Sequence, residues 1–167
     1  IKFYNRDLVD EIIEEVGIPK EIMEKVEEGG TIAGKGAEGD VRGSFSKYAD
    51  LTDRAIHVQK QIIRKLAEKE SCVIIGRSAD YILKDRDDVL NVFIHGDMPE
   101  KTKRIMGLYN VEEKEAVKMM ADTDKRRMTN YNFYTDQKWG KASNYTLCLN
   151  SSKLGCDRCE KIIMECI

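Results

Sequence analysis

The sequence predicts an α/β fold with a doubly wound parallel sheet and helices on both faces, and three short apolar runs carry that prediction. The runs at 72–76, 89–94 and 145–149 are rich in β-branched and aliphatic residues, as strands buried on both faces of a parallel sheet are. A helical pattern follows each run. Strands that alternate with helices favour a doubly wound sheet, whose ligands bind at the carboxyl ends of the strands.

Apolar residues three and four positions apart indicate the helices. We expect helices at 6–16, 19–27, about 52–66, 79–84, 99–108, 111–134 and 154–167. Thr52 or Asp53 is expected to cap the third of these. Between Gly29 and Tyr48, six glycines and the lack of a periodic apolar face predict a mobile loop.

Composition and charge indicate one globular domain over residues 1–167. Of the 167 residues, 41% are hydrophobic and 35% charged, and the net charge is −2. Such a chain lacks a bulk basic field for nucleic acid, so bound phosphate would need a local cluster of positive charge. The sequence contains no apolar run of membrane-spanning length and opens without a signal-peptide pattern, so the expected location is the cytoplasm, with no nucleic-acid or membrane partner.

The stretch at 28–39, EGGTIAGKGAEG, is close to a phosphate-binding loop. Gly29 and Gly34-Lys35 fit the spacing G-x-x-x-x-G-K, but Gly36 stands where a magnesium-binding hydroxyl is needed. The stretch also follows a predicted helix and leads into more loop, whereas a working phosphate loop joins a strand to a helix. A surface connection is therefore the better interpretation, and ATP phosphates at Lys35 are the weaker alternative.

Charged residues stand at the predicted strand ends. Arg77 closes the first strand and Asp80 lies one turn further, which would hold a guanidinium at the edge where anions bind. The competing interpretation is that Arg77 only pairs with Asp80. His95 closes the second strand and could act in acid/base chemistry, although a structural role is commoner for a lone histidine.

The predicted helix at 111–134 carries the run Asp124-Lys-Arg-Arg127. One helical turn puts Asp124 beside Arg127, a spacing suited to an acceptor for a base or sugar and a fork for a phosphate. A solvated charged face is an equally good interpretation.

The five cysteines are odd in number and three of them crowd the C-terminal segment, which favours reduced thiols over a disulfide framework. Cys156-x-x-Cys159 could be half of a metal site or a redox pair, but no second CxxC or His pair completes it. The spacing more simply places both side chains on one apolar helix face, so we predict no metal site.

Taken in order, these segments resemble the cytidylate kinase-like family, relatives of the nucleoside monophosphate kinases. The resemblance covers nearly the whole chain except residues 29–50. The segments that carry it are Phe3-Tyr-Asn-Arg-Asp-Leu8, the stretch 72–83, Val92-Phe-Ile-His95, Lys103-Arg104, Asp124-Lys-Arg-Arg127, Tyr131-x-Phe-Tyr134 with Trp139-Gly140, and Asn144-Tyr-x-Leu-Cys-Leu-Asn150.

The resemblance implies a P-loop kinase fold and transfer of the terminal phosphoryl group of ATP, with Mg²⁺, to a nucleoside monophosphate. The family's name implies CMP or dCMP as the acceptor. The residues that would bind the acceptor are Arg77, Asp80, Asp124 and Arg127. The catalytic cations of a helical lid at about 100–141 would be Arg104, Lys118 and Arg126. Phosphoryl transfer needs alignment and charge compensation of this kind, and lid closure would exclude water.

The chain departs from the family pattern at its start. The family's glycine-rich phosphate loop precedes the Phe3 segment, so we expect that loop upstream of Ile1, and Asn5 replaces the more usual Asp. Relatives have a mobile acceptor-binding region where residues 29–50 lie, which would bring Lys35 or Arg42 towards the substrate. The rival hypotheses are a kinase of another small metabolite and a regulator that binds a nucleotide without turnover.

Overall fold

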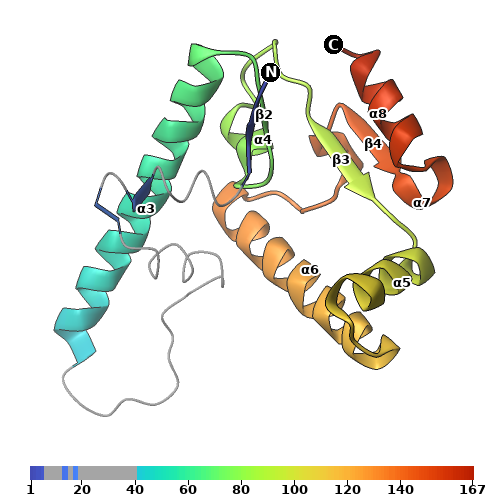
Figure 1. The fold of residues 1–167 in the computed structure, drawn as a ribbon. Helices are drawn as coiled ribbons and strands as arrows, with labels where there is room; N and C mark the ends of the chain where they lie inside the picture. The colour runs from blue at the N-terminus through green and yellow to red at the C-terminus, as the bar shows by residue number, and fades with distance from the viewer. Residues whose placement is uncertain (6–12, 15–16, 19–40) are drawn as a thin grey trace. The chain divides into compact units, whose positions relative to one another are not determined.

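The computed structural model of the protein describes residues 1–5, 13–14, 17–18 and 41–167, with the backbone alone for 41–52 (Figure 1). The chain divides into two compact units, which we describe one at a time. Unit 1 is Ile1–Asp85 with Thr129–Asp136, and unit 2 is Arg86–Met128 with Gln137–Ile167. The predicted helix at 19–27, most of that at 6–16, and the glycine stretch at 28–39 lie outside the described residues.

Unit 1 is built on two parallel strands. β1 (Lys2–Tyr4) pairs with β2 (Cys72–Ile74) in a register that places Tyr4 opposite Ile74. The strand predicted at 72–76 is therefore confirmed, while β1 escaped prediction because three residues are too few to show a period. Glu70 ties the pair together, since its carboxylate contacts Lys2 Nζ at 3.2 Å and accepts a hydrogen bond from Tyr4 Oη at 3.1 Å.

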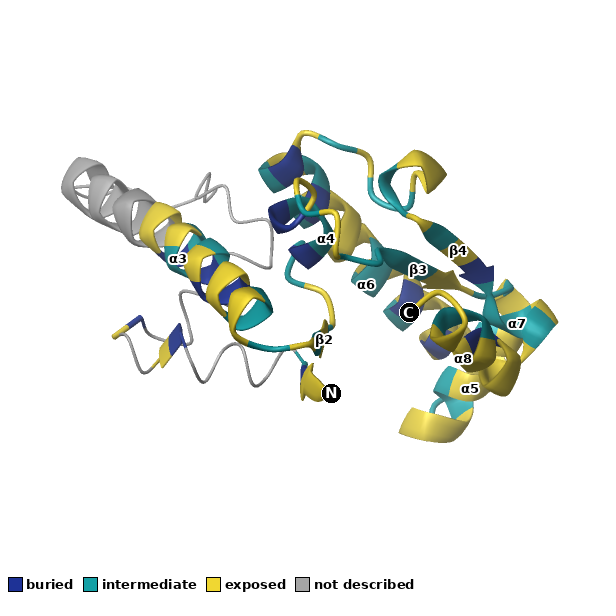
Figure 2. Cartoon of the chain, turned by 90° about the horizontal axis from the view of Figure 1, so that it is seen from above, coloured by how far each residue is buried: buried dark blue, intermediate teal, exposed yellow. Residues whose placement is uncertain are grey.

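Helix α3 (Val41–Lys69) supplies most of the core of unit 1. Its buried residues Ala55 and Ile62 recur two turns apart and pack with Ile13 and Ile18, which are 0% and 2% exposed. Figure 2 shows buried positions alternating with exposed ones along the described part of this helix.

The N-terminal end of α3 corrects a prediction, because the helix begins at Val41 rather than at Thr52 or Asp53. Residues 41–48 were predicted to be loop. The spacing of Val41, Phe45 and Tyr48 is in fact helical. Gly43 hid this pattern, although a helix interior glycine costs only about 1 kcal/mol relative to alanine.

Unit 2 is built on a second parallel pair, β3 (Val92–His95) and β4 (Leu147–Asn150), with His95 opposite Asn150. The strands predicted at 89–94 and 145–149 are confirmed, each displaced towards its C-terminus.

The other elements of the chain are α4 (Ala79–Ile82) of unit 1, α5 (Met98–Tyr109), α6 (Glu113–Thr135), the 3-10 turn η1 (Ala142–Asn144), α7 (Ser151–Leu154) and α8 (Cys156–Met164).

The helices predicted at 99–108 and 111–134 match α5 and α6 closely. The helix predicted at 154–167 is interrupted, because Gly155 has φ 76° and ψ 158° and separates α7 from α8. A backbone with that φ cannot continue a right-handed helix, and glycine adopts it without a steric penalty.

The described residues form two parallel sheets of two strands each, so the fold is mixed α/β with parallel pairing, and a doubly wound sheet remains a prediction. The prediction that the strands are buried on both faces is wrong for the residues described. Val73 and Ile75 are 47% and 53% exposed and Ile94 is 54% exposed, whereas Ile74 packs against the core of unit 1. None of the described helices has the length and apolar composition needed to cross a membrane.

Candidate functional site

The turn after β2 is strained backbone. Gly76, Arg77 and Ser78 all have positive φ, at 77°, 56° and 52°. Non-glycine residues in this conformation each cost about 1–2 kcal/mol and persist where their surroundings hold them, often at binding sites. Here the Ala79 N–H donates to the Gly76 carbonyl at 3.1 Å, and α4 starts directly after the turn.

Gln59 of α3 also holds this turn. The side chain is 9% exposed and its Nε2 donates to the Arg77 carbonyl at 3.2 Å. Its Oε1 is buried and accepts no hydrogen bond from any residue that the structure describes. Sequence reasoning missed Gln59 because a glutamine on an amphipathic helix carries no local signal of a tertiary contact.

Asp80 lies on α4 and accepts a hydrogen bond from Tyr131 Oη at 2.6 Å. Burial raises the pKa of the Asp80 carboxyl, and the hydrogen bonds from Tyr131 and from the backbone N–H groups of Tyr81 and Asp80 oppose this rise. The competing interpretation from sequence, an Arg77–Asp80 ion pair, stays a prediction.

In unit 2, Asp124 lies between two cations. Its Oδ1 contacts Arg127 Nη1 at 3.4 Å and its Oδ2 contacts Lys101 Nζ at 3.1 Å. The predicted neighbourhood of Asp124 and Arg127 is confirmed. Lys101 comes from α5 and was not predicted, because a contact between two helices leaves no spacing signal in the sequence. The Arg127 side chain is 61% exposed and therefore accessible to an anion.

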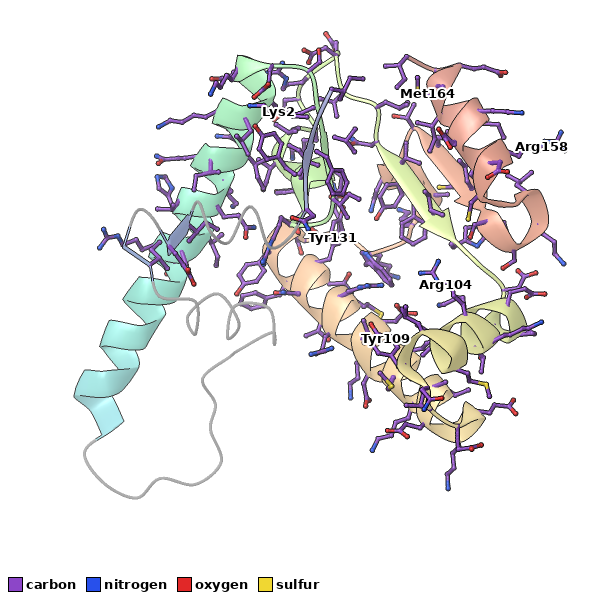
Figure 3. The ribbon with its side chains drawn as sticks, viewed as in Figure 1. Lys2, Arg104, Tyr109, Tyr131, Arg158 and Met164 are labelled. Carbon is purple, nitrogen blue, oxygen red and sulfur yellow. The ribbon has the colours of Figure 1, made fainter. Side chains whose placement is uncertain are left out.

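The three cations assigned to a lid stand on α5 and α6. Arg104 is on α5, where Figure 3 labels it, and Lys118 and Arg126 are on α6. All three are exposed, and Arg126 Nη2 donates to Thr123 Oγ1 at 3.4 Å. Exposed cations fit a solvated charged face and a lid equally well, so the lid role stays a prediction.

The carboxyl ends of β3 and β4 meet in a polar network around Asp97. Asn150 Nδ2 donates to Asp97 Oδ1 at 2.9 Å, and Lys153 Nζ lies 3.0 Å from Oδ2. These contacts, Asn150 first, lower the pKa of Asp97, and the same ion pair raises the pKa of Lys153. Asn150 Oδ1 also accepts the N–H groups of Ser152 and Lys153 and so caps α7. Sequence reasoning considered His95 at this strand end and missed the partners of Asp97.

His95 and Phe93 belong to an aromatic cluster on β3. The His95 ring stacks on Phe93 at 6.3 Å, and its carbonyl accepts a hydrogen bond from Ser151 Oγ at 2.9 Å. Phe93 stacks on Tyr145 at 4.9 Å and meets the edge of Trp139 at 5.5 Å. These contacts favour the structural interpretation of His95.

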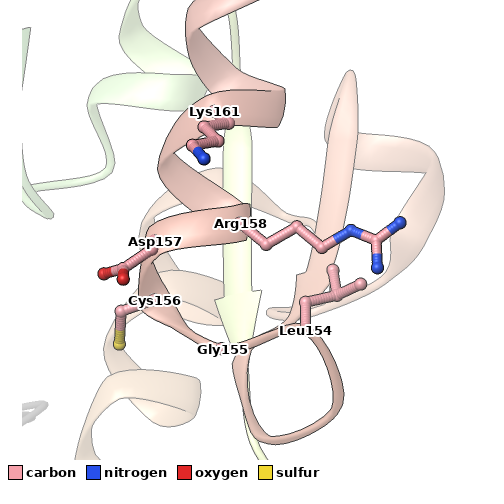
Figure 4. Close-up of a pocket in the computed structure, with 6 residues that line it drawn as sticks. All are labelled: Leu154, Gly155, Cys156, Asp157, Arg158 and Lys161. Carbon is pink, nitrogen blue, oxygen red and sulfur yellow. The ribbon is translucent and has the colours of Figure 1, made fainter.

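The hollow of about 480 Å³ beside the turn between α7 and α8 contains none of the predicted site residues. Figure 4 shows its lining: Leu154, Gly155, Cys156, Asp157, Arg158 and Lys161. Over the part of the chain that the structure describes, no three His, Cys, Asp or Glu side chains are grouped to hold a metal ion.

The comparisons with known proteins decide the family. The model of the cytidylate kinase-like family matches residues 1–153. The chain belongs to the cytidylate kinase-like family. This confirms the resemblance drawn from the sequence segments, and every candidate site residue lies within the matched range. Membership of this kinase-like family indicates a phosphotransferase type of activity.

A crystal structure of an uncharacterized protein from Eubacterium ventriosum is also similar to this chain. The two share 34% sequence identity with a TM-score of 0.74, over 100% of this chain and 83% of that chain. No curated protein matches the sequence. Membership of the cytidylate kinase-like family therefore indicates a shared fold and a kinase type of activity, while the acceptor has to be argued from the residues.

Proposed function

We propose that this protein transfers the terminal phosphoryl group of ATP, with Mg²⁺, to a nucleoside monophosphate, and that the acceptor is CMP or dCMP. The family match over residues 1–153 carries the proposal. Polar groups at the end of β2 in unit 1 and cations on α5 and α6 in unit 2 supply the chemistry that such a transfer uses.

Arg77 and Asp80 are the proposed acceptor-binding residues of unit 1. The strained turn fixes the backbone at Arg77, and Gln59 holds its carbonyl. A guanidinium binds phosphate through paired N–H groups, so a fixed backbone gives its fork a defined origin. Asp80, held by its hydrogen bond from Tyr131, offers the acceptor's base or sugar a carboxyl group that accepts a hydrogen bond.

Arg127 and Asp124 are the proposed acceptor-binding residues of unit 2. Asp124 keeps Arg127 and Lys101 together, and the exposed guanidinium can then meet an oxygen of the monophosphate. The proposed roles of Arg104, Lys118 and Arg126 are to offset the negative charge on the transferred phosphoryl group. The attacking oxygen belongs to the acceptor, so the protein supplies positioning and charge rather than a covalent group.

Mg²⁺ would arrive with the ATP phosphates, which supply some of its oxygen ligands. The groups proposed to hold the acceptor can be tested by substitution within this sequence.

The deciding experiment measures ATP consumption by the complete natural chain with CMP, dCMP, UMP, AMP, GMP or no acceptor. Turnover with CMP or dCMP well above the blank supports the proposal. Turnover with another monophosphate keeps the kinase and corrects the acceptor. Blank-level rates with every acceptor, together with nucleotide binding measured by calorimetry, would replace the proposal with a regulator that binds without turnover.

A further inference from the structure

The two cysteines of the CxxC segment have different environments. Cys156 is the first residue of α8 and is exposed, whereas Cys159 lies one turn further and is 4% exposed. Figure 4 shows the Cys156 side chain on the opposite side of the helix from Arg158. The two residues share one face of α8 with Ile163 and Met164, as their spacing predicted, but they differ in exposure.

Both thiols nevertheless line the same cavity of about 330 Å³. Its wall also includes Ile94 of β3 and Ile163 and Met164 of α8. Cys156 is thus reachable from solvent, and the buried Cys159 lines the same cavity beside it. Solvent can bring a reagent to Cys156, and Cys159 is placed to resolve the product.

The backbone at this point can adjust to join the two sulfurs. Helical neighbours have Cβ atoms about 5–6 Å apart, and a disulfide needs about 3.5–4.5 Å. Cys156 begins the helix, where the backbone N–H groups have no intrahelical acceptor, so moving it breaks no helical bond that its own N–H makes. Gly155 precedes it with φ 76°, a residue that accepts further change in φ and ψ.

We propose that Cys156 and Cys159 form a reversible dithiol–disulfide couple whose oxidant is a small-molecule disulfide of the glutathione type. The Cys156 thiolate attacks one sulfur of the small disulfide, forms a mixed disulfide and releases one small thiolate. Cys159 then loses its proton and attacks the Cys156 sulfur, which forms the internal disulfide and releases the second small thiol. Two protein thiols are oxidised and one small disulfide is reduced to two thiols.

This couple is independent of the proposed phosphoryl transfer. Both cysteines lie beyond residue 153, where the family match ends. No residue proposed for the acceptor or for the lid lines their cavity. The test below therefore stands whether or not the protein is a kinase.

The test equilibrates the complete protein with reduced and oxidised glutathione at several ratios, quenches with acid, alkylates the remaining thiols and weighs the C-terminal peptides. We expect the peptide with Cys156 and Cys159 to lose two hydrogens without gaining glutathione, and dithiothreitol to reverse the change. The ratio of the disulfide to the dithiol form should be proportional to the oxidised glutathione concentration and inversely proportional to the square of the reduced glutathione concentration. Cys166, exposed in the same unit, is the internal control and should gain glutathione instead.

The Cys159→Ser variant traps the first step and should carry glutathione at Cys156, with circular dichroism as the check that it is folded. Phenylarsine oxide gives a second measurement that needs no variant, because its trivalent arsenic should bridge both thiols and protect the pair from alkylation together. The proposal is overturned if glutathione stays on Cys156 of the unaltered protein while Cys159 remains reduced. It is also overturned if the arsenical protects neither thiol.

Discussion

The polar groups of unit 1 and those of unit 2 differ in how they are held. In unit 1, Asp80 is partly buried, is hydrogen-bonded to Tyr131, and has a raised pKa. In unit 2, Asp97 pairs with the exposed Lys153, Asp124 pairs with the exposed Arg127 and the half-buried Lys101, and the pKa of Asp97 is lowered. Asp80 and Asp97 each lie just after a parallel strand, yet the pKa of Asp80 is raised and that of Asp97 is lowered. Position after a strand therefore does not by itself set the pKa of an acidic residue.

Because of this difference, we expect the polar groups of the two units to contribute differently to stability and to binding. Exposed ion pairs contribute about 0–1 kcal/mol to folding, so breaking such a pair to bind a ligand costs little stability. A partly buried carboxyl with a hydrogen-bond partner contributes more to the local structure and exchanges that partner less readily. We therefore expect substitutions in unit 2 to reduce activity with little change in stability, and substitutions around Asp80 to reduce stability first.

The largest effect is expected from Arg127→Ala. If Arg127 binds the monophosphate, its loss should raise KM for the acceptor and lower kcat, with about 2–4 kcal/mol of transition-state stabilisation removed. The midpoint of urea unfolding should hardly change, because the pair with Asp124 is exposed. Lys125→Ala, an exposed cation on the same helix, is the matched control. Steady-state constants equal to those of the unaltered enzyme would remove Arg127 from the site.

A smaller effect, on stability, is expected from Tyr131→Phe. The substitution removes the donor to Asp80 and leaves the ring in place, so unfolding in urea should require about 1–3 kcal/mol less. Tyr134→Phe, on the same helix, controls for the loss of a hydroxyl away from Asp80. A Tyr131→Phe variant as stable as its control would show that this hydrogen bond adds nothing to unit 1.

The two acids should also give opposite dependences on pH. The raised pKa of Asp80 means that the folded state binds its proton more tightly, so this group costs stability as pH rises from 3.8 through the raised value. The lowered pKa of Asp97 contributes stability above 3.8 that is lost as pH falls through the folded value.

Asp80→Asn and Asp97→Asn test these signs by urea unfolding at several pH values. Relative to the unaltered protein, Asp80→Asn should gain stability as pH rises through its window. Asp97→Asn should lose stability at neutral pH and match the unaltered protein in acid. Parallel curves for the two variants would mean that both acids have the same environment.

The sequence predicted what depends on neighbours in the chain. Helices α5 and α6 and the Asp124–Arg127 pair follow from local spacing, and all were predicted. The partners of Asp80 and Asp97 lie 51 and 53 residues away, and the Lys101–Asp124 contact spans 23 residues. Such contacts depend on packing between elements, which spacing does not encode. The positive φ values at Arg77 and Ser78 were equally hidden, because neither is a residue type that signals a left-handed backbone.

The smallest effect on activity is expected from replacing Cys156 and Cys159 together by Ser. These side chains take no part in the proposed phosphoryl transfer, so kcat and KM should equal those of the unaltered enzyme. Stability should fall modestly, because only Cys159 is buried and serine places a hydroxyl there. The measurement is the ATP-consumption assay in reducing buffer, with Cys148→Ser and Cys166→Ser, both at exposed positions, as the matched control. A large loss of activity in the folded double variant would show that the dithiol is coupled to the acceptor site. In unit 2, groups that affect stability could then no longer be distinguished from groups that affect binding.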